Sequence, residues 1–148
     1  MKVLCERQAS SLAGEVKELL RDVRPVGDSG PTVSSRGTSL PVAGRYDVVV
    51  VGAGTSGAPA AIAAARHGAE TLVIEYQHGL GGVGTVGLIG RYWKGYRKGF
   101  TKEVDKGVAS LRSDQAQPVK GWNIYNKMEW FRRQLRQAGG NIWLNSLA

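Results

Sequence analysis

Six residues near the middle of the chain, Gly52-Ala53-Gly54-Thr55-Ser56-Gly57, have the spacing G-x-G-x-x-G. A loop of this kind binds the diphosphate of a dinucleotide when it joins a strand to a helix. Gly52 would allow the sharp turn, Gly54 would let a phosphate approach the backbone, and Gly57 would let helix and strand pack closely. The amides at the start of the helix, aided by its dipole, would bind the anion.

The sequence on both sides of this loop predicts the elements that must position it. The β-branched apolar run at residues 46–51 predicts a strand buried on both faces, as in a parallel sheet. The alanine-rich segment 56–67 predicts a helix that Gly68 ends, and residues 71–75 predict a second strand. Strand, glycine turn, helix and strand together form one βαβ unit.

An acid stands where such a unit needs one. Glu75 lies 23 residues after Gly52, at the end of the second predicted strand. A carboxylate near this offset accepts hydrogen bonds from the hydroxyls of the adenosine ribose, and it repels the 2′-phosphate of NADP. The alternative is a solvated carboxylate at a strand end. The context of the complete βαβ unit favours the binding role.

The run Tyr46–Glu75 resembles the FAD-binding fingerprint of the flavoproteins with two dinucleotide-binding domains. A second glycine-rich run, Gly79–Gly87, resembles the loop of FAD-dependent oxidoreductases related to fumarate-reductase flavoproteins. The resemblance covers about residues 45–148. It implies FAD as cofactor, backbone contacts from Gly81 and Gly82, and a hydroxyl contact from Thr85. A plain surface loop is the alternative for this second run, although five glycines in nine residues are costly in entropy.

The expected fold class is α/β, a Rossmann-like FAD/NAD(P)-binding fold with a parallel sheet, truncated after the third strand. That strand is expected at residues 141–144, after a helix at 124–138 that turns Lys127 and three arginines away from its apolar face. We expect an incomplete FAD-binding domain at 45–148, irregular in its glycine-rich segment 76–107. Residues 1–44 are expected to be an extension with an amphipathic helix at 11–23 and a linker rich in Pro, Gly and Ser at 24–44. The break after a third strand suggests a piece of a longer protein.

Charge leaves other functions open. The net charge is +8, and residues 91–148 carry twelve basic against four acidic residues, which places the whole excess in this half. Basic and aromatic residues alternate in the segment 91–100, a pattern that can bind single-stranded nucleic acid. The segment can also border an anionic substrate, which makes Tyr92, Trp93 and Tyr96 candidates for the vicinity of the flavin. A surface covered by another domain is the plainest interpretation, and we expect no nucleic-acid partner.

The function implied by the resemblance is the FAD-binding portion of a flavin-dependent oxidoreductase, which transfers hydride or electrons between FAD and a small-molecule substrate. The alternatives are an NAD-binding dehydrogenase or regulatory module, and a nucleic-acid-binding protein. No catalytic residue can be assigned, His78 is expected to be a solvated loop histidine, and the fragment alone is expected to be inactive. With one cysteine, Cys5, and no Cys/His spacing for a metal, we expect no metal site and a cytoplasmic protein without a membrane partner.

Overall fold

The computed structural model describes residues 31–35, 38–111 and 121–148. Contacts divide the chain into residues 1–45 and residues 46–148. In the first unit, β1 (Thr32–Ser35) and β2 (Thr38–Pro41) pair antiparallel, with Val33 opposite Leu40. The prediction that residues 24–44 are a linker was therefore wrong for these strands, because backbone pairing forms here in spite of the prolines and serines. The expected helix at 11–23 lies outside the described residues.

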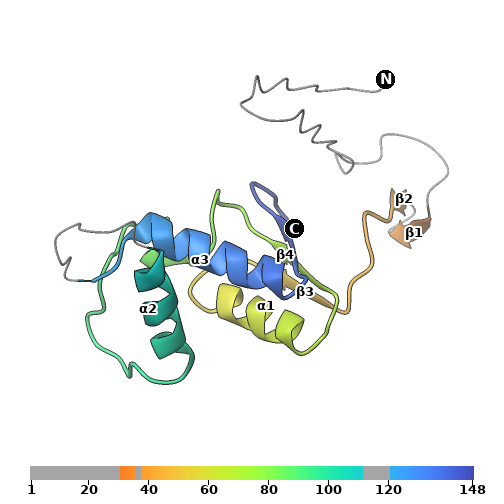
Figure 1. The fold of residues 1–148 in the computed structure, drawn as a ribbon. Coiled ribbons are helices and arrows are strands. Elements are labelled where there is room, and N and C mark those ends of the chain that lie inside the picture. The colour runs from red at the N-terminus through yellow and green to blue at the C-terminus, as the bar shows by residue number, and fades with distance from the viewer. Residues whose placement is uncertain (1–30, 36–37, 112–120) are drawn as a thin grey trace, which may run out of the picture. The chain divides into compact units, whose positions relative to one another are not determined.

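The described residues of the second unit form a parallel sheet of three strands in the order β3-β4-β5, of which Figure 1 labels β3 and β4. Its strands are β3 (Val48–Val51), β4 (Thr71–Ile74) and β5 (Asn141–Trp143). Val49 lies opposite Leu72, and Val73 lies opposite Ile142. The expected parallel sheet is confirmed, as is the Rossmann-like α/β class, of which this chain contains a part.

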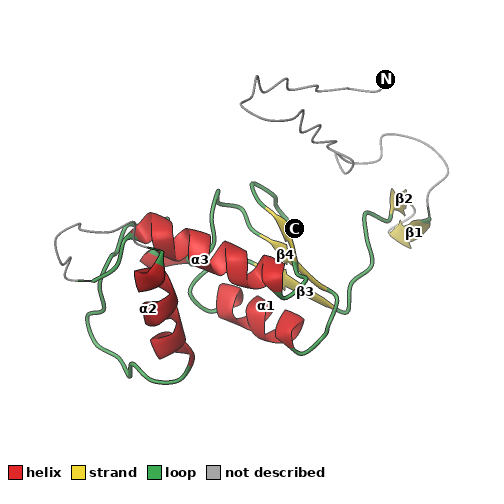
Figure 2. Cartoon of the chain, in the orientation of Figure 1, coloured by secondary structure: helices red, strands yellow, loops and turns green. Residues whose placement is uncertain are grey.

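In the described part of this unit, three helices accompany the sheet: α1 (Gly57–Arg66), α2 (Phe100–Ser110) and α3 (Ile124–Gln137). Helix α1 contacts β3, β4 and α3, and α2 contacts α3 (Figure 2). Helix α2 corrects the expectation of an irregular segment at 76–107: Val104 and Val108, one turn apart, are buried against the core. The other core members come mainly from α1 and α3, among them Ile62, Trp130 and Leu135.

The alanines of α1 let it lie close to the strands. Ala58, Ala61 and Ala65 are buried on one side of the helix. At its end Gly68 has a φ of +87°, which a glycine adopts without strain, and its amide donates to the carbonyl of Ala65. The expected glycine at the end of this helix is confirmed.

One face of β3 departs from the expectation of a strand buried on both faces. Val49 is 48% exposed and Val51 is 65% exposed. Helix α1, which contacts β3, covers the side of Val48 and Val50, and in the described part of the chain no helix covers the other side. The apolar run thus indicated a strand of a parallel sheet correctly, although this chain provides cover for only one face.

Candidate functional site

The turn between β3 and α1 is built by two of its glycines. Gly52 has a φ of +85°, and its amide donates to the carbonyl of Ile74 at 2.8 Å, which ties the turn to β4. A Cβ on Gly57 would collide with the carbonyl oxygen of Gly52 and stand 3.3 Å from Cγ1 of Val50. Helix and strand can therefore approach this closely only because residue 57 has no side chain.

Gly54 has a different surrounding. A Cβ placed there would meet nothing within 4 Å, so the backbone at this point borders open space. The carbonyl of Gly54 accepts from the amide of Ala58, the first hydrogen bond of α1. The amides of residues 54–57 precede that bond and have no backbone acceptor among the described residues. Thr55 and Ser56 are exposed, and the Ser56 side chain does not cap the helix. Free amides at a helix start form an anion-binding site.

The carboxylate of Glu75 joins the two strand ends. Its Oε2 accepts from the amide of Ala53 at 2.6 Å, and its Oε1 accepts from the amide of Gln77 at 2.7 Å. Glu75 is only 8% exposed, so these two bonds fix its orientation. Each carboxylate oxygen retains capacity for a further hydrogen bond, which a ribose hydroxyl could donate. Sequence reasoning placed this acid correctly beside the glycine loop, but it did not foresee the bond to Ala53.

The second glycine run packs directly on the first. Gly81 has a φ of +104°, and its amide donates to the carbonyl of Ala53 at 2.8 Å. It precedes a short 3-10 turn, η1 (Gly82–Gly84). A Cβ on Gly82 would lie 2.9 Å from Cα of Gly54 and 3.1 Å from the amide nitrogen of Thr55. The two loops expected to bind one ligand are thus in contact, although the residues that touch lie 27 or 28 positions apart in the sequence.

Two residues that were expected to contact the cofactor, Thr85 and Ala53, make hydrogen bonds within the protein. Thr85 is fully buried, and its hydroxyl bonds with the carbonyl of Leu80 at 2.7 Å and lies 3.2 Å from that of Gly82. It therefore holds the second loop in shape, in place of the hydroxyl contact to cofactor that the resemblance implied. Ala53 is also fully buried, and its amide and carbonyl serve Glu75 and Gly81. The remaining expected residues lie around the same turn: Gly52, Gly54, Thr55, Ser56, Gly57, Gly81 and Gly82.

An aromatic and charged cluster lies at the Gly84 end of η1, and sequence reasoning missed most of it. Trp122 donates from Nε1 to the carbonyl of Gly84 at 2.7 Å. Its ring lies 4.5 Å from that of Tyr92, and the two planes are tilted by 58°. The Tyr92 hydroxyl donates to Asp105 at 2.9 Å, and burial together with this bond raises the pKa of Tyr92 to about 12.

Lys127 belongs to the same cluster, which corrects the expectation that it points away from the apolar face of its helix. It is 8% exposed, and its Nζ lies 3.5 Å from the centroid of the Trp122 ring. The aromatic rings of residues 92 and 122 lie beside its ammonium group, so a helical-wheel pattern within α3 alone could not reveal its burial. Trp93 and Tyr96, the other two aromatic candidates, are 89% and 77% exposed and are not gathered there.

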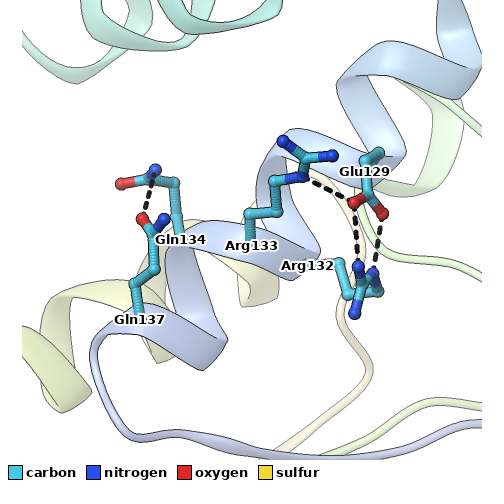
Figure 3. A network of polar contacts seen from close by, with 5 residues as sticks. All are labelled: Glu129, Arg132, Arg133, Gln134 and Gln137. Atoms are coloured by element: carbon cyan, nitrogen blue, oxygen red, sulfur yellow. Dashed lines mark hydrogen bonds and ion pairs between the residues drawn. The ribbon is translucent and has the colours of Figure 1, made fainter. Parts of the chain in front are cut away.

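The outer surface of α3 carries a separate polar network (Figure 3). Arg132 donates to both oxygens of Glu129 at 2.7 and 2.8 Å, and Arg133 donates to Oε1 at 2.6 Å. These two guanidinium groups lower the pKa of Glu129 to about 2. Arg132 and Glu129 also border a cavity of about 230 Å³ together with His78, Met128 and Leu144. Gly79 and Leu80, at the start of the second glycine run, also line this cavity, whereas the residues of the first glycine loop and Glu75 do not.

The described residues offer no helix long and apolar enough to cross a membrane. Within the same ranges, no group of three His, Cys, Asp or Glu side chains could hold a metal ion.

Several known proteins and one family model resemble parts of this chain. The model of the family described as FAD dependent oxidoreductase matches residues 47–139. A digeranylgeranylglycerophospholipid reductase of Thermoplasma acidophilum is 39% identical over 84 residues, which are 57% of this chain and 19% of the reductase. A tRNA uridine 5-carboxymethylaminomethyl modification enzyme, MnmG, of Bacillus licheniformis is 69% identical over 32 residues, 22% of this chain and 5% of that enzyme.

Among solved structures, a geranylgeranyl bacteriochlorophyll reductase-like protein of Thermoplasma acidophilum aligns with a TM-score of 0.40 and 27% identity. The alignment covers 68% of this chain and 30% of that protein. The chain thus spans a third or less of the length of each of these relatives.

Proposed function

The chain belongs to the family of FAD-dependent oxidoreductases, and we propose that it is the portion of such an enzyme that holds the adenosine diphosphate half of FAD. One observation carries the proposal: two glycine loops pack against each other beside a nearly buried carboxylate. Gly82 lies against Gly54, and the Glu75 carboxylate accepts from the amide of Ala53 between them. Glycine residues, free amides and an acid in one place suit a diphosphate and the ribose next to it.

The residues divide the work by their chemistry. The amides of residues 54–57 would donate to the diphosphate oxygens, and the positive end of the α1 dipole would add to this attraction. Open space at Gly54 leaves room for a phosphate to approach the backbone. Glu75 would accept from the ribose hydroxyls and would repel a 2′-phosphate, so NADP should not bind here.

FAD, when bound, supplies the hydride or electron transfer that the family performs. We propose that the reaction partner is a small molecule and that the remaining parts of the enzyme provide the groups that contact it. The single cysteine agrees with a reducing compartment such as the cytoplasm, which stays a prediction.

The experiment is equilibrium binding of FAD to the chain and to two variants of Glu75. Glu75→Ala removes the acceptor for both ribose hydroxyls and for the amide of Ala53, and it should weaken FAD binding by about tenfold or more, as expected for hydrogen bonds to a charged group. Glu75→Gln keeps one acceptor oxygen for Ala53 and should bind FAD with an intermediate affinity. Circular dichroism of both variants serves as the control for folding. If both variants bind FAD as tightly as the unchanged chain, Glu75 does not bind the ribose, and the role that we propose for its carboxylate is wrong.

A further inference from the structure

Lys127 is a largely buried cation beside aromatic rings, and among the residues that the structure describes it has no anionic partner of its own. Its Nζ lies 3.5 Å from the centroid of the Trp122 ring and 5.5 Å from that of Tyr92. The residue as a whole is 8% exposed. Burial lowers the pKa of Lys127, and the negative charge of Asp105 counteracts this in part. An ammonium that gives up part of its water without gaining a hydrogen bond with the protein is unfavourable, so its position calls for an explanation.

The charges around Lys127 do not supply that partner. Within the described residues, no carboxylate or carbonyl accepts a hydrogen bond from its Nζ. Asp105 accepts from the Tyr92 hydroxyl at 2.9 Å and from Nη2 of Arg97 at 2.7 Å. Among the described residues no fully buried side-chain nitrogen or oxygen lacks a hydrogen-bond partner, so this Nζ must still reach the surface. Among the described residues, two cations, Lys127 and Arg97, therefore share the carboxylate of Asp105, and these three groups keep an excess of one positive charge.

The ammonium is placed at the second glycine loop. A Cβ on Gly84 would stand 3.0 Å from Nζ and 3.4 Å from Cζ2 of Trp122, so the lysine head rests against the bare backbone of this glycine. The bond from Trp122 Nε1 to the Gly84 carbonyl holds the two segments together. Gly84 ends the same three-residue turn whose first member, Gly82, packs on Gly54 of the nucleotide loop.

We propose that Lys127 is an anion-recognition residue, whose ammonium donates to a phosphate or carboxylate oxygen that lies over Gly84. The inference rests on the proposed function, because it assigns the second glycine loop to the same ligand site. The anion has two sources with the same chemistry: the diphosphate of FAD, or an acidic group of the substrate. In either case the ligand provides the negative charge that the described residues do not place beside Lys127. The tilted rings of Trp122 and Tyr92 hold the ammonium in place by cation–π attraction.

A purely structural lysine would behave differently, and two variants separate the cases. Lys127→Met keeps an apolar stem for the aromatic rings and removes the charge. Lys127→Arg restores the charge. Lys102→Met is the matched control, because Lys102 is an exposed lysine of α2 and its replacement changes the net charge equally.

Each protein is tested by equilibrium binding of FAD, ADP, adenosine and inorganic phosphate. If the anion is the diphosphate of FAD, Lys127→Met weakens ADP binding by about tenfold, adenosine binding is unchanged, and Lys127→Arg recovers most of the loss. If the anion belongs to the substrate, Lys127→Met binds FAD and ADP normally, but the FAD-loaded chain loses the phosphate binding that the unchanged chain and Lys102→Met show. The inference is overturned if Lys127→Met equals the unchanged chain toward ADP and toward phosphate, including the case in which neither binds phosphate. The proposed function fails separately, if the unchanged chain binds neither FAD nor ADP.

Discussion

Gly57 and Gly54 occupy the same loop, and replacement of each by alanine should have opposite consequences. In Gly57→Ala the new methyl group collides with the backbone carbonyl of Gly52, and it also stands 3.0 Å from the carbonyl carbon and 3.3 Å from Cγ1 of Val50. The first two of these atoms are backbone atoms, so α1 must move away from β3. In Gly54→Ala the methyl group meets nothing within 4 Å, and the chain itself accommodates it.

The magnitude follows from these contacts. Forcing an extra carbon into a packed interface costs about 1–3 kcal/mol. Alanine regains at most about 1 kcal/mol over glycine in a helix, and less at the first helical residue. Gly57→Ala should therefore lower the free energy of unfolding by about 2 kcal/mol. Gly54→Ala should change it by less than about 0.5 kcal/mol, as for an exposed site without special contacts.

Urea unfolding of both variants, followed by circular dichroism, measures the difference through the midpoint concentration. Equilibrium FAD binding then completes the comparison: Gly54→Ala should lose affinity although its fold is intact, because its methyl group fills the space meant for the diphosphate. Equal unfolding midpoints for the two variants would refute the packing argument. Unchanged FAD affinity in Gly54→Ala would refute the assignment of the open space to a phosphate.

Further predictions concern the surroundings of this loop. Thr85→Val removes the hydrogen bonds to two loop carbonyls and should lower the free energy of unfolding by about 1 kcal/mol in a urea titration. The FAD affinity of the folded variant should stay unchanged. A loss of FAD affinity without a loss of stability would show that this hydroxyl contacts the ligand after all. The pKa of Tyr92 is raised to about 12 by burial and by the bond to Asp105, so the stability from its protonated form is present below about pH 10 and is lost as the pH rises toward 12. Phenolate absorbance should show one tyrosine that titrates late in the unchanged chain. In Asp105→Asn the same tyrosine should titrate at a lower pH, though still late because its burial remains, and the absence of a late tyrosine in the unchanged chain would contradict this. The pKa of Glu129 is lowered to about 2, so its small surface contribution to stability is present above about pH 4.5 and fades as the pH falls toward 2, a dependence that Glu129→Gln should remove from acid unfolding curves.

Local signals in the sequence predicted the part of the fold that contains the candidate ligand site. The valine run of β3, the alanines of α1 and the glycine at position 68 each have a single structural use, and together they specify a βαβ unit. Glu75 was found for the same reason, since its offset from Gly52 fixes it at the end of β4. These features depend on residues close in sequence, where the backbone rules are strict.

The parts that were missed depend on partners far away in sequence. Val104 and Val108 repeat at helical spacing, but the glycines and aromatic residues before them hid the start of α2. The burial of Lys127 requires Tyr92, 35 residues earlier in the chain. The hydroxyl of Thr85 could be assigned to a ligand or to its own loop, and only the fold of residues 80–85 shows that the carbonyl of Leu80 accepts from it.

The most direct test of the account is the binding of FAD, NAD and ADP to the folded chain, measured side by side by calorimetry. Both glycine loops and Glu75 belong to one site in this account, so FAD should bind well above NAD, and ADP should compete with it for the same site. Comparable affinities for FAD and NAD would reduce the site to a general adenine-dinucleotide loop. The absence of binding by a chain that circular dichroism shows to be folded would contradict the central claim.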